Sequence, residues 1–138
     1  MKSLELRLLE SLLPWRNAAA WRVAFSGGLD STVLLHLLAA LGRLEELPAL
    51  TAIHIEHGLQ SAAQGWPSHC QQVCAALGVP LLIEQVAVQR GTSSLERAAR
   101  HARYLAFECL LAPDEVLLTA QHRDDQAETL LFRLVRGS

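Results

Sequence analysis

The chain has 138 residues, 51% hydrophobic and 19% charged, a composition that fits one folded domain and excludes a disordered chain. Its net charge of −2 lacks the basic surplus that nucleic-acid-binding surfaces usually carry. The three cysteines form no CxxC pair, which excludes a disulfide framework and a cysteine zinc site and predicts reduced thiols in the cytoplasm.

The N-terminal segment predicts an amphipathic helix over residues 3–14, because Glu5 and Glu10 interrupt the apolar core that a signal peptide needs. No apolar run is long enough to span a membrane. Further along, short apolar runs alternate with helical patterns. The expected strands are 21–25, 49–55, 80–86 and 115–120, and the expected helices are about 31–41, 62–77, 94–111 and 124–135. This alternation predicts an α/β fold, a doubly wound parallel sheet that binds ligands at the carboxyl ends of its strands.

The first expected strand runs directly into the loop SGGLDS, residues 26–31. Its two glycines allow a tight turn and close backbone approach, and the following helix offers its positive N-terminus, so the loop predicts a phosphate site. A carboxylate beside phosphates needs a cation between them, which makes Asp30 a candidate Mg²⁺ ligand. The alternative is an ordinary turn in which Asp30 or Ser31 only caps the helix. Walker and Rossmann motifs are absent from the sequence.

Polar residues near the second strand and in the third helix are further candidates. His54 and His57 flank the carboxyl end of the second strand, although from the spacing alone packing of His54 in the strand and a solvated turn at His57 are the favoured explanations. The third helix carries Arg97, Arg100 and Arg103, whose guanidinium groups suit a phosphate or a carboxylate. A solvated helix face accounts for Arg97.

Acidic residues open the expected fourth helix. Capping explains Asp124, but Asp125 and Glu128 lie three residues apart on one helix face, where capping cannot use both. At the carboxyl end of a strand they would form a negative pocket for a cation or an ammonium group. Functional and structural explanations of this pair both stay open.

The string SGGLDS resembles the signature of the N-type ATP pyrophosphatases, or PP-loop enzymes, which cleave ATP between its α and β phosphates and adenylate an oxygen of their substrate. The succession SGGLDS, AIHIEHGLQ, LERAARHARY and LLTAQHRDDQAETLLFRLVRGS is similar to the tRNA(Ile)-lysidine synthetases over nearly all of residues 20–138. The thiolating PP-loop enzymes typically carry CxxC pairs, which this chain lacks. It departs from the lysidine synthetases at Glu56, where Asn or His is common, and at Gln60, where Arg is common.

The resemblance implies an adenine nucleotide α hydrolase-like fold that uses ATP and Mg²⁺. Its members replace the C2 oxygen of the first anticodon cytidine in an isoleucine tRNA with a CAU anticodon by free L-lysine, which changes codon reading from AUG to AUA. The residues implied for ATP are Ser26, Gly27, Gly28, Asp30 and Ser31. Asp30, Arg100 and Arg103 are implied in catalysis, Asp125 and Glu128 in lysine binding, and His54 and His57 as residues that line the site.

The resemblance also implies that residues 1–138 are an incomplete domain, with C-terminal strands and the tRNA-binding domains missing. We then expect the fragment alone to be inactive, and its open sheet edge to favour a homodimer. Two alternatives are another PP-loop adenylating enzyme, such as a tRNA thiolase or an amidating synthetase, and a nucleotide-binding module without catalysis.

Overall fold

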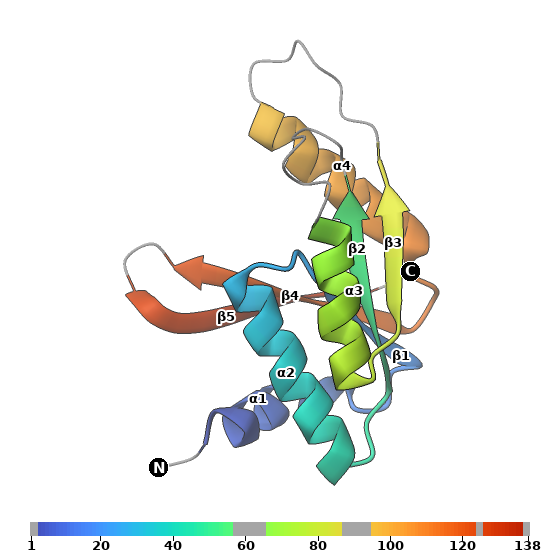
Figure 1. The fold of residues 1–138 in the computed structure, drawn as a ribbon. Helices are drawn as coiled ribbons and strands as arrows, with labels where there is room; N and C mark the ends of the chain where they lie inside the picture. The colour runs from blue at the N-terminus through green and yellow to red at the C-terminus, as the bar shows by residue number, and fades with distance from the viewer. Residues whose placement is uncertain (1–2, 57–65, 87–94, 124–125, 137–138) are drawn as a thin grey trace.

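The computed structural model describes residues 3–56, 66–86, 95–123 and 126–136, with the backbone alone at 66, 95–100, 121–123 and 126–136. Helices and strands alternate along most of the chain (Figure 1). The elements are α1 (Leu4–Leu12), a 3-10 turn η1 (Leu13–Trp15), β1 (Ala20–Ala24), α2 (Leu29–Leu44), β2 (Ala49–Glu56), α3 (Trp66–Leu77), β3 (Leu81–Gln85), α4 (Leu95–Leu110), β4 (Glu115–Arg123) and β5 (Gln126–Arg136). Among the described residues, no helix combines the length and the apolar character needed to cross a membrane.

The strands form one sheet in the order β3-β2-β1-β4-β5. Strands β1 to β4 run parallel to one another, and β1 lies between β2 and β4, so that Val23 faces Ala52 on one side and Leu118 on the other. The chain moves outward from β1 to β3 and then returns to the opposite side of β1. Sheets of this kind bind ligands at the carboxyl ends of the strands where the strand order reverses, which here is the end of β1.

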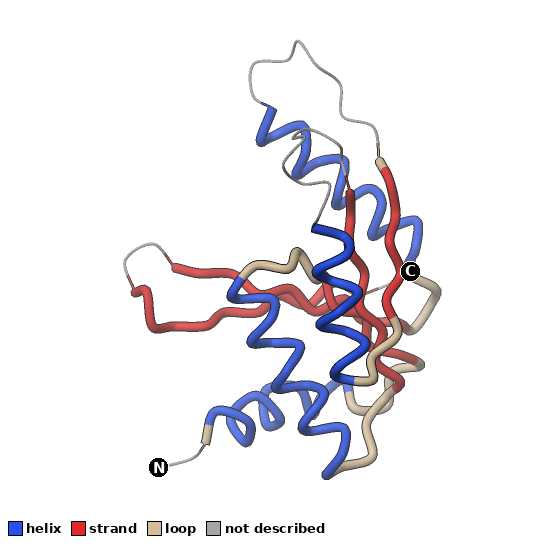
Figure 2. Tube along the Cα trace, in the orientation of Figure 1, coloured by secondary structure: helices blue, strands red, loops and turns tan. Residues whose placement is uncertain are grey.

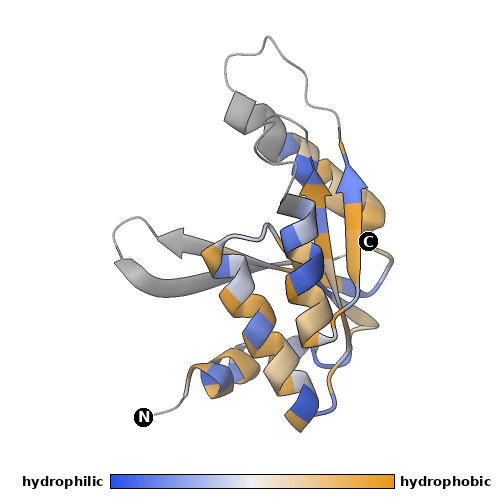
Figure 3. Ribbon diagram, viewed as in Figure 1, coloured by the Kyte–Doolittle hydropathy of each residue, from blue (hydrophilic) through white to orange (hydrophobic). Residues whose placement is uncertain are grey.

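Helices cover both faces of the sheet, which confirms the doubly wound α/β prediction. On one face Trp21, Val23 and Phe25 of the first strand region pack in a cluster with residues of α1, α2 and α3. On the other face Ile53 and Ile55 pack against the end of α4. Figure 1 shows α2 and α3 in front of the sheet and α4 behind it. Hydrophobic and hydrophilic residues interleave along α1 and α2, as Figure 3 shows, so each helix has an apolar side to bury.

The N-terminal helix α1 lies within the range predicted for it. The Ser3 hydroxyl accepts a hydrogen bond from the Leu6 N–H at 3.2 Å and caps the helix. Leu8 and Leu12 are buried against the core, which fixes α1 on the same face as α2. The helix then tightens into η1 at Pro14, and the Trp21 indole N–H donates to the Trp15 carbonyl at 3.0 Å.

The predicted helix over residues 124–135 is wrong. Residues 126–136 form β5, which pairs antiparallel with β4, and β4 itself extends to Arg123. A run such as Leu130–Val135 suits a strand as well as a helix, and the edge of β4 offers ladder partners for the backbone groups of β5 that face it. The edge of β4 is therefore covered, and the edge of the sheet on this side is β5. The expected homodimer through an open edge stays a prediction.

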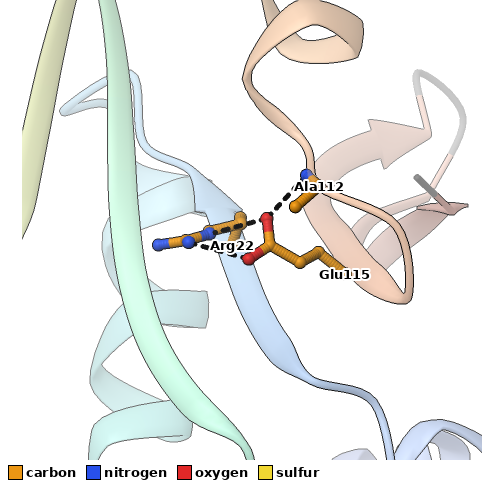
Figure 4. A network of polar contacts seen from close by, with 3 residues as sticks. All are labelled: Arg22, Ala112 and Glu115. Atoms are coloured by element: carbon orange, nitrogen blue, oxygen red, sulfur yellow. Dashed lines mark hydrogen bonds and ion pairs between the residues drawn. The ribbon is translucent and has the colours of Figure 1, made fainter. Parts of the chain in front are cut away.

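An ion pair joins Arg22 in the middle of β1 to Glu115, the first residue of β4 (Figure 4). Arg22 donates to Glu115 through Nε at 3.3 Å and through Nη2 at 2.9 Å, and the Ala112 N–H donates to the same carboxylate at 2.9 Å. The hydrogen bond from Arg22 is the main cause that lowers the pKa of Glu115, helped by the Ala112 N–H and opposed by burial. This network locks β4 against β1 at the end that carries no candidate chemistry.

Candidate functional site

The candidate site is the loop between β1 and α2, at the carboxyl end of the central strand. Figure 2 shows this loop in tan as it leaves the sheet and enters α2. Strand β1 ends at Ala24, and Phe25 continues it with its N–H donating to the Ile53 carbonyl at 2.8 Å. The loop therefore begins from a backbone that β2 holds in place.

A hydrogen-bond network folds the loop on itself. The Ser26 N–H donates to the Ser31 hydroxyl at 3.2 Å, and the Gly28 N–H donates to the Ser26 hydroxyl at 3.1 Å. The Ser31 hydroxyl in turn donates to the Gly28 carbonyl at 3.3 Å. The two hydroxyl oxygens lie 3.0 Å apart, a contact in which either can donate. The two serines thus fix the backbone of the turn between them.

Both glycines are required by this conformation. Gly27 has φ 87°, a left-handed value that costs other residues about 1–2 kcal/mol. At Gly28 a Cβ would lie 3.3 Å from the Ser26 hydroxyl oxygen, which is tighter than ordinary contact. A side chain at either position would therefore disturb the serine network.

The alternative that Asp30 or Ser31 merely caps the helix is wrong. The N-cap of α2 is Gly28, which makes no side-chain cap, and its carbonyl accepts from both the N–H and the hydroxyl of Thr32, at 3.0 and 2.7 Å. Asp30 lies in the first turn of α2, half-buried, and the Ser31 hydroxyl serves the loop. The positive end of a 16-residue helix thus lies beside two serine hydroxyls and a carboxylate, an arrangement suited to a phosphate with a cation.

His54 is packed within β2, one of the two explanations that the sequence leaves open for it. Its side chain is 5% exposed, and Nδ1 lies 3.0 Å from the Phe25 carbonyl oxygen and 3.7 Å from the Cys70 sulfur. A carbonyl only accepts, so Nδ1 carries the proton. Burial, together with the nearby Cys74, raises the pKa of Cys70 to about 11, and this thiol stays protonated beside the ring. The side chain of His54 thus touches the peptide that leads into the loop.

The structure gives less detail on the remaining candidate residues. Arg103 is half-buried in α4, and Arg100 lies in the same helix, where the backbone alone is described. Glu128 lies in the strand β5, so the prediction that it shares one face of a helix with Asp125 is wrong. His57 and Asp125, like Gln60, lie outside the described residues. Within the described part, the structure brings together the loop residues and His54.

Comparison with known proteins agrees with this geometry. A family model described as the PP-loop domain matches residues 2–138. The chain belongs to the PP-loop domain family. Curated relatives named tRNA(Ile)-lysidine synthase are 67% identical over 135 residues in Pseudomonas aeruginosa, 64% over 132 residues in Pseudomonas fluorescens and 53% over 116 residues in Escherichia coli O157:H7.

These matches cover nearly all of this PP-loop domain but a minor part of the relatives. The alignment with the Pseudomonas aeruginosa protein takes in 98% of this chain and 30% of that protein, so the chain spans about a third of its relatives' length. A solved NMN synthetase from Francisella tularensis is similar at 15% identity with a TM-score of 0.49, over 84% of this chain and 54% of that one. Within the PP-loop domain, residues 26–31 are the loop whose geometry suits a nucleotide phosphate.

Proposed function

We propose that this PP-loop domain is the ATP-using, adenylating part of a tRNA(Ile)-lysidine synthase. In the first step the C2 oxygen of the anticodon cytidine attacks the α-phosphorus of ATP, and pyrophosphate leaves. In the second step the ε-amine of lysine attacks C2, the C–O bond breaks, and AMP leaves with the oxygen. Adenylation turns a poor leaving group into a good one, which is the chemical reason for using ATP.

One observation carries the proposal: the identity of 67% over 135 residues with a protein named tRNA(Ile)-lysidine synthase. Identity at this level spans the loop and the sheet that positions it. The folded geometry of residues 26–31 supports the ATP half of the reaction independently, because its hydroxyls and helix terminus suit phosphate oxygens.

Within this proposal Ser26, Gly27, Gly28, Asp30 and Ser31 bind ATP. Asp30 also holds Mg²⁺, which usually takes one or two carboxylates and completes its shell with phosphate oxygens and water. No group of three or more ligating side chains forms a metal cluster among the described residues. When bound, the ion neutralises the charge that develops as pyrophosphate leaves.

The other substrates are assigned on the resemblance. Asp125 and Glu128 hold the charged amines of lysine, and Arg100 and Arg103 contact a phosphate or the flipped base. An isoleucine tRNA with a CAU anticodon is the partner, which places the reaction in the cytoplasm. Its backbone is bound by further domains, since a net charge of −2 offers a polyanion little.

The test is lysine incorporation by the full-length protein. Isoleucine tRNA transcript, ATP, Mg²⁺ and labelled lysine are incubated together, and label in the tRNA is measured with a methionine tRNA of the same CAU anticodon as the control. The proposal expects label in the isoleucine tRNA alone. Binding of ATP without any label would favour a nucleotide-binding module, and transfer of sulfur would favour a thiolating enzyme.

A further inference from the structure

The loop network continues into the core through one peptide group. The backbone C=O of Phe25 and the N–H of Ser26 belong to the same planar unit, so fixing one fixes the direction of the other. His54 bonds the C=O at 3.0 Å, and the N–H donates to the Ser31 hydroxyl at 3.2 Å. A continuous path therefore runs from the buried ring through this peptide to the serine pair.

We propose that His54 is the positioning residue of the phosphate-binding loop, acting through its Nδ1–H donor to the Phe25 carbonyl. The strand pairing between β1 and β2 ends at Ala24 and Ile53, one residue before this peptide. The side chain of His54 thus adds one more hydrogen bond from β2, at the peptide where the loop begins.

The surroundings of His54 favour this role over a proton-transfer role. The ring is 5% exposed, and it lies between the Phe25 carbonyl and the thiol of Cys70 in α3. Cys70 itself is fully buried, so the ring edge that carries Nδ1 faces the protein interior. The ring acts on the nucleotide through the backbone, which explains why a histidine in this strand belongs to the site without touching substrate.

The inference rests on the proposed use of ATP, so the experiment measures nucleotide binding directly. The dissociation constant of ATP with Mg²⁺ is measured by calorimetry on the full-length protein. His54→Leu removes the donor and leaves the buried carbonyl without it, and the dissociation constant should rise roughly 5- to 50-fold. His54→Asn places an amide N–H near the position of Nδ1 and should stay within about threefold of the parent protein.

Two controls separate positioning from general damage. His54→Gln carries the same amide one bond further out and should bind ATP as weakly as the leucine variant, which keeps the test decisive if His54→Leu does not fold. Ile55→Ala removes buried volume from the other face of β2 and should lower the melting temperature without changing ATP affinity. The KM for lysine should stay unchanged in the asparagine and glutamine variants.

The outcomes separate a failure of the role proposed for His54 from a failure of the proposed function. Equal ATP affinity in the parent and in the leucine or glutamine variant would overturn the role of His54 and leave the proposed function intact. Equal loss in the asparagine and glutamine variants would overturn it too, since the position of the donor would not matter. A parent protein that does not bind ATP would overturn the proposed function itself.

Discussion

Replacing Glu115 with glutamine tests how strongly one ion pair joins β1 to β4. The carboxylate accepts two hydrogen bonds from Arg22 and one from the Ala112 N–H, and 10% of its side chain is exposed. The amide keeps one acceptor and presents an N–H₂ group toward the guanidinium. Charge-assisted bonds of this kind contribute about 1.5–3 kcal/mol. We expect less than the roughly 3–5 kcal/mol of a fully buried pair, because 27% of the Arg22 side chain reaches solvent.

For a chain of 138 residues this loss corresponds to a melting temperature lower by about 5–12 °C. Glu45→Gln is the matched control, because Glu45 pairs with Arg16 at 3.5 Å with both side chains more than 40% exposed. Exposed pairs of this kind contribute about 0–1 kcal/mol. Both melting temperatures are measured by circular dichroism at pH 7.

The contribution of Glu115 to stability should depend on pH in a definite direction. The pKa of Glu115 is lowered in the folded protein, so its contribution is complete above the unfolded value of about 4.3 and disappears as the pH falls through the folded value. The difference in melting temperature between the parent and Glu115→Gln should therefore be constant from pH 6 to 8, at roughly the size given above. It should shrink below about pH 4. A difference that matches the Glu45→Gln control at pH 7 would refute the argument that this network locks the strands.

Three further predictions concern the loop, the lysine site and the thiols. Gly27→Ala should cost about 1–2 kcal/mol of stability and weaken ATP binding, whereas Gly42→Ala in the last turn of α2 should stabilise the protein. Equal effects of the two substitutions would contradict the argument that the positive φ of Gly27 strains other residues. Glu128→Gln should raise the KM for lysine roughly ten- to a hundredfold in the full-length protein and leave the KM for ATP nearly unchanged. A thiol reagent should label Cys109 quickly and the two buried cysteines of α3 only after unfolding; rapid labelling of all three would contradict the packing of α3.

Much of the fold could be predicted because its strands and helices carry different periodicities. The observed strand β2 differs from the expected 49–55 by one residue, and α3 ends at Leu77, before Gly78 with φ 71°, where a stop signal was expected. The segment 124–135 could not be assigned in this way, since its apolar run suits either state. Its pairing with β4 depends on the edge of the sheet, which local sequence does not contain.

The sequence could single out the loop as a candidate phosphate site, but it could not give the hydrogen bonds within the loop. Two glycines, two serines and a carboxylate between a strand and a helix indicate a phosphate site at short range. The bond between His54 and Phe25 joins residues 29 apart, so it appears only when β2 lies beside β1. A buried histidine one residue before the end of a strand's apolar run is the signal that could have suggested it.

The most direct test of the account is release of pyrophosphate from ATP by the full-length protein with its tRNA, in the parent and in Asp30→Asn. The substitution keeps the size of the side chain and removes the charge that we propose as the ligand of Mg²⁺ beside the phosphates. The account predicts tRNA-dependent release in the parent and a loss of at least about a hundredfold in the variant, with an unchanged melting temperature. Near-normal pyrophosphate release by Asp30→Asn would contradict the assignment of residues 26–31 as the ATP site.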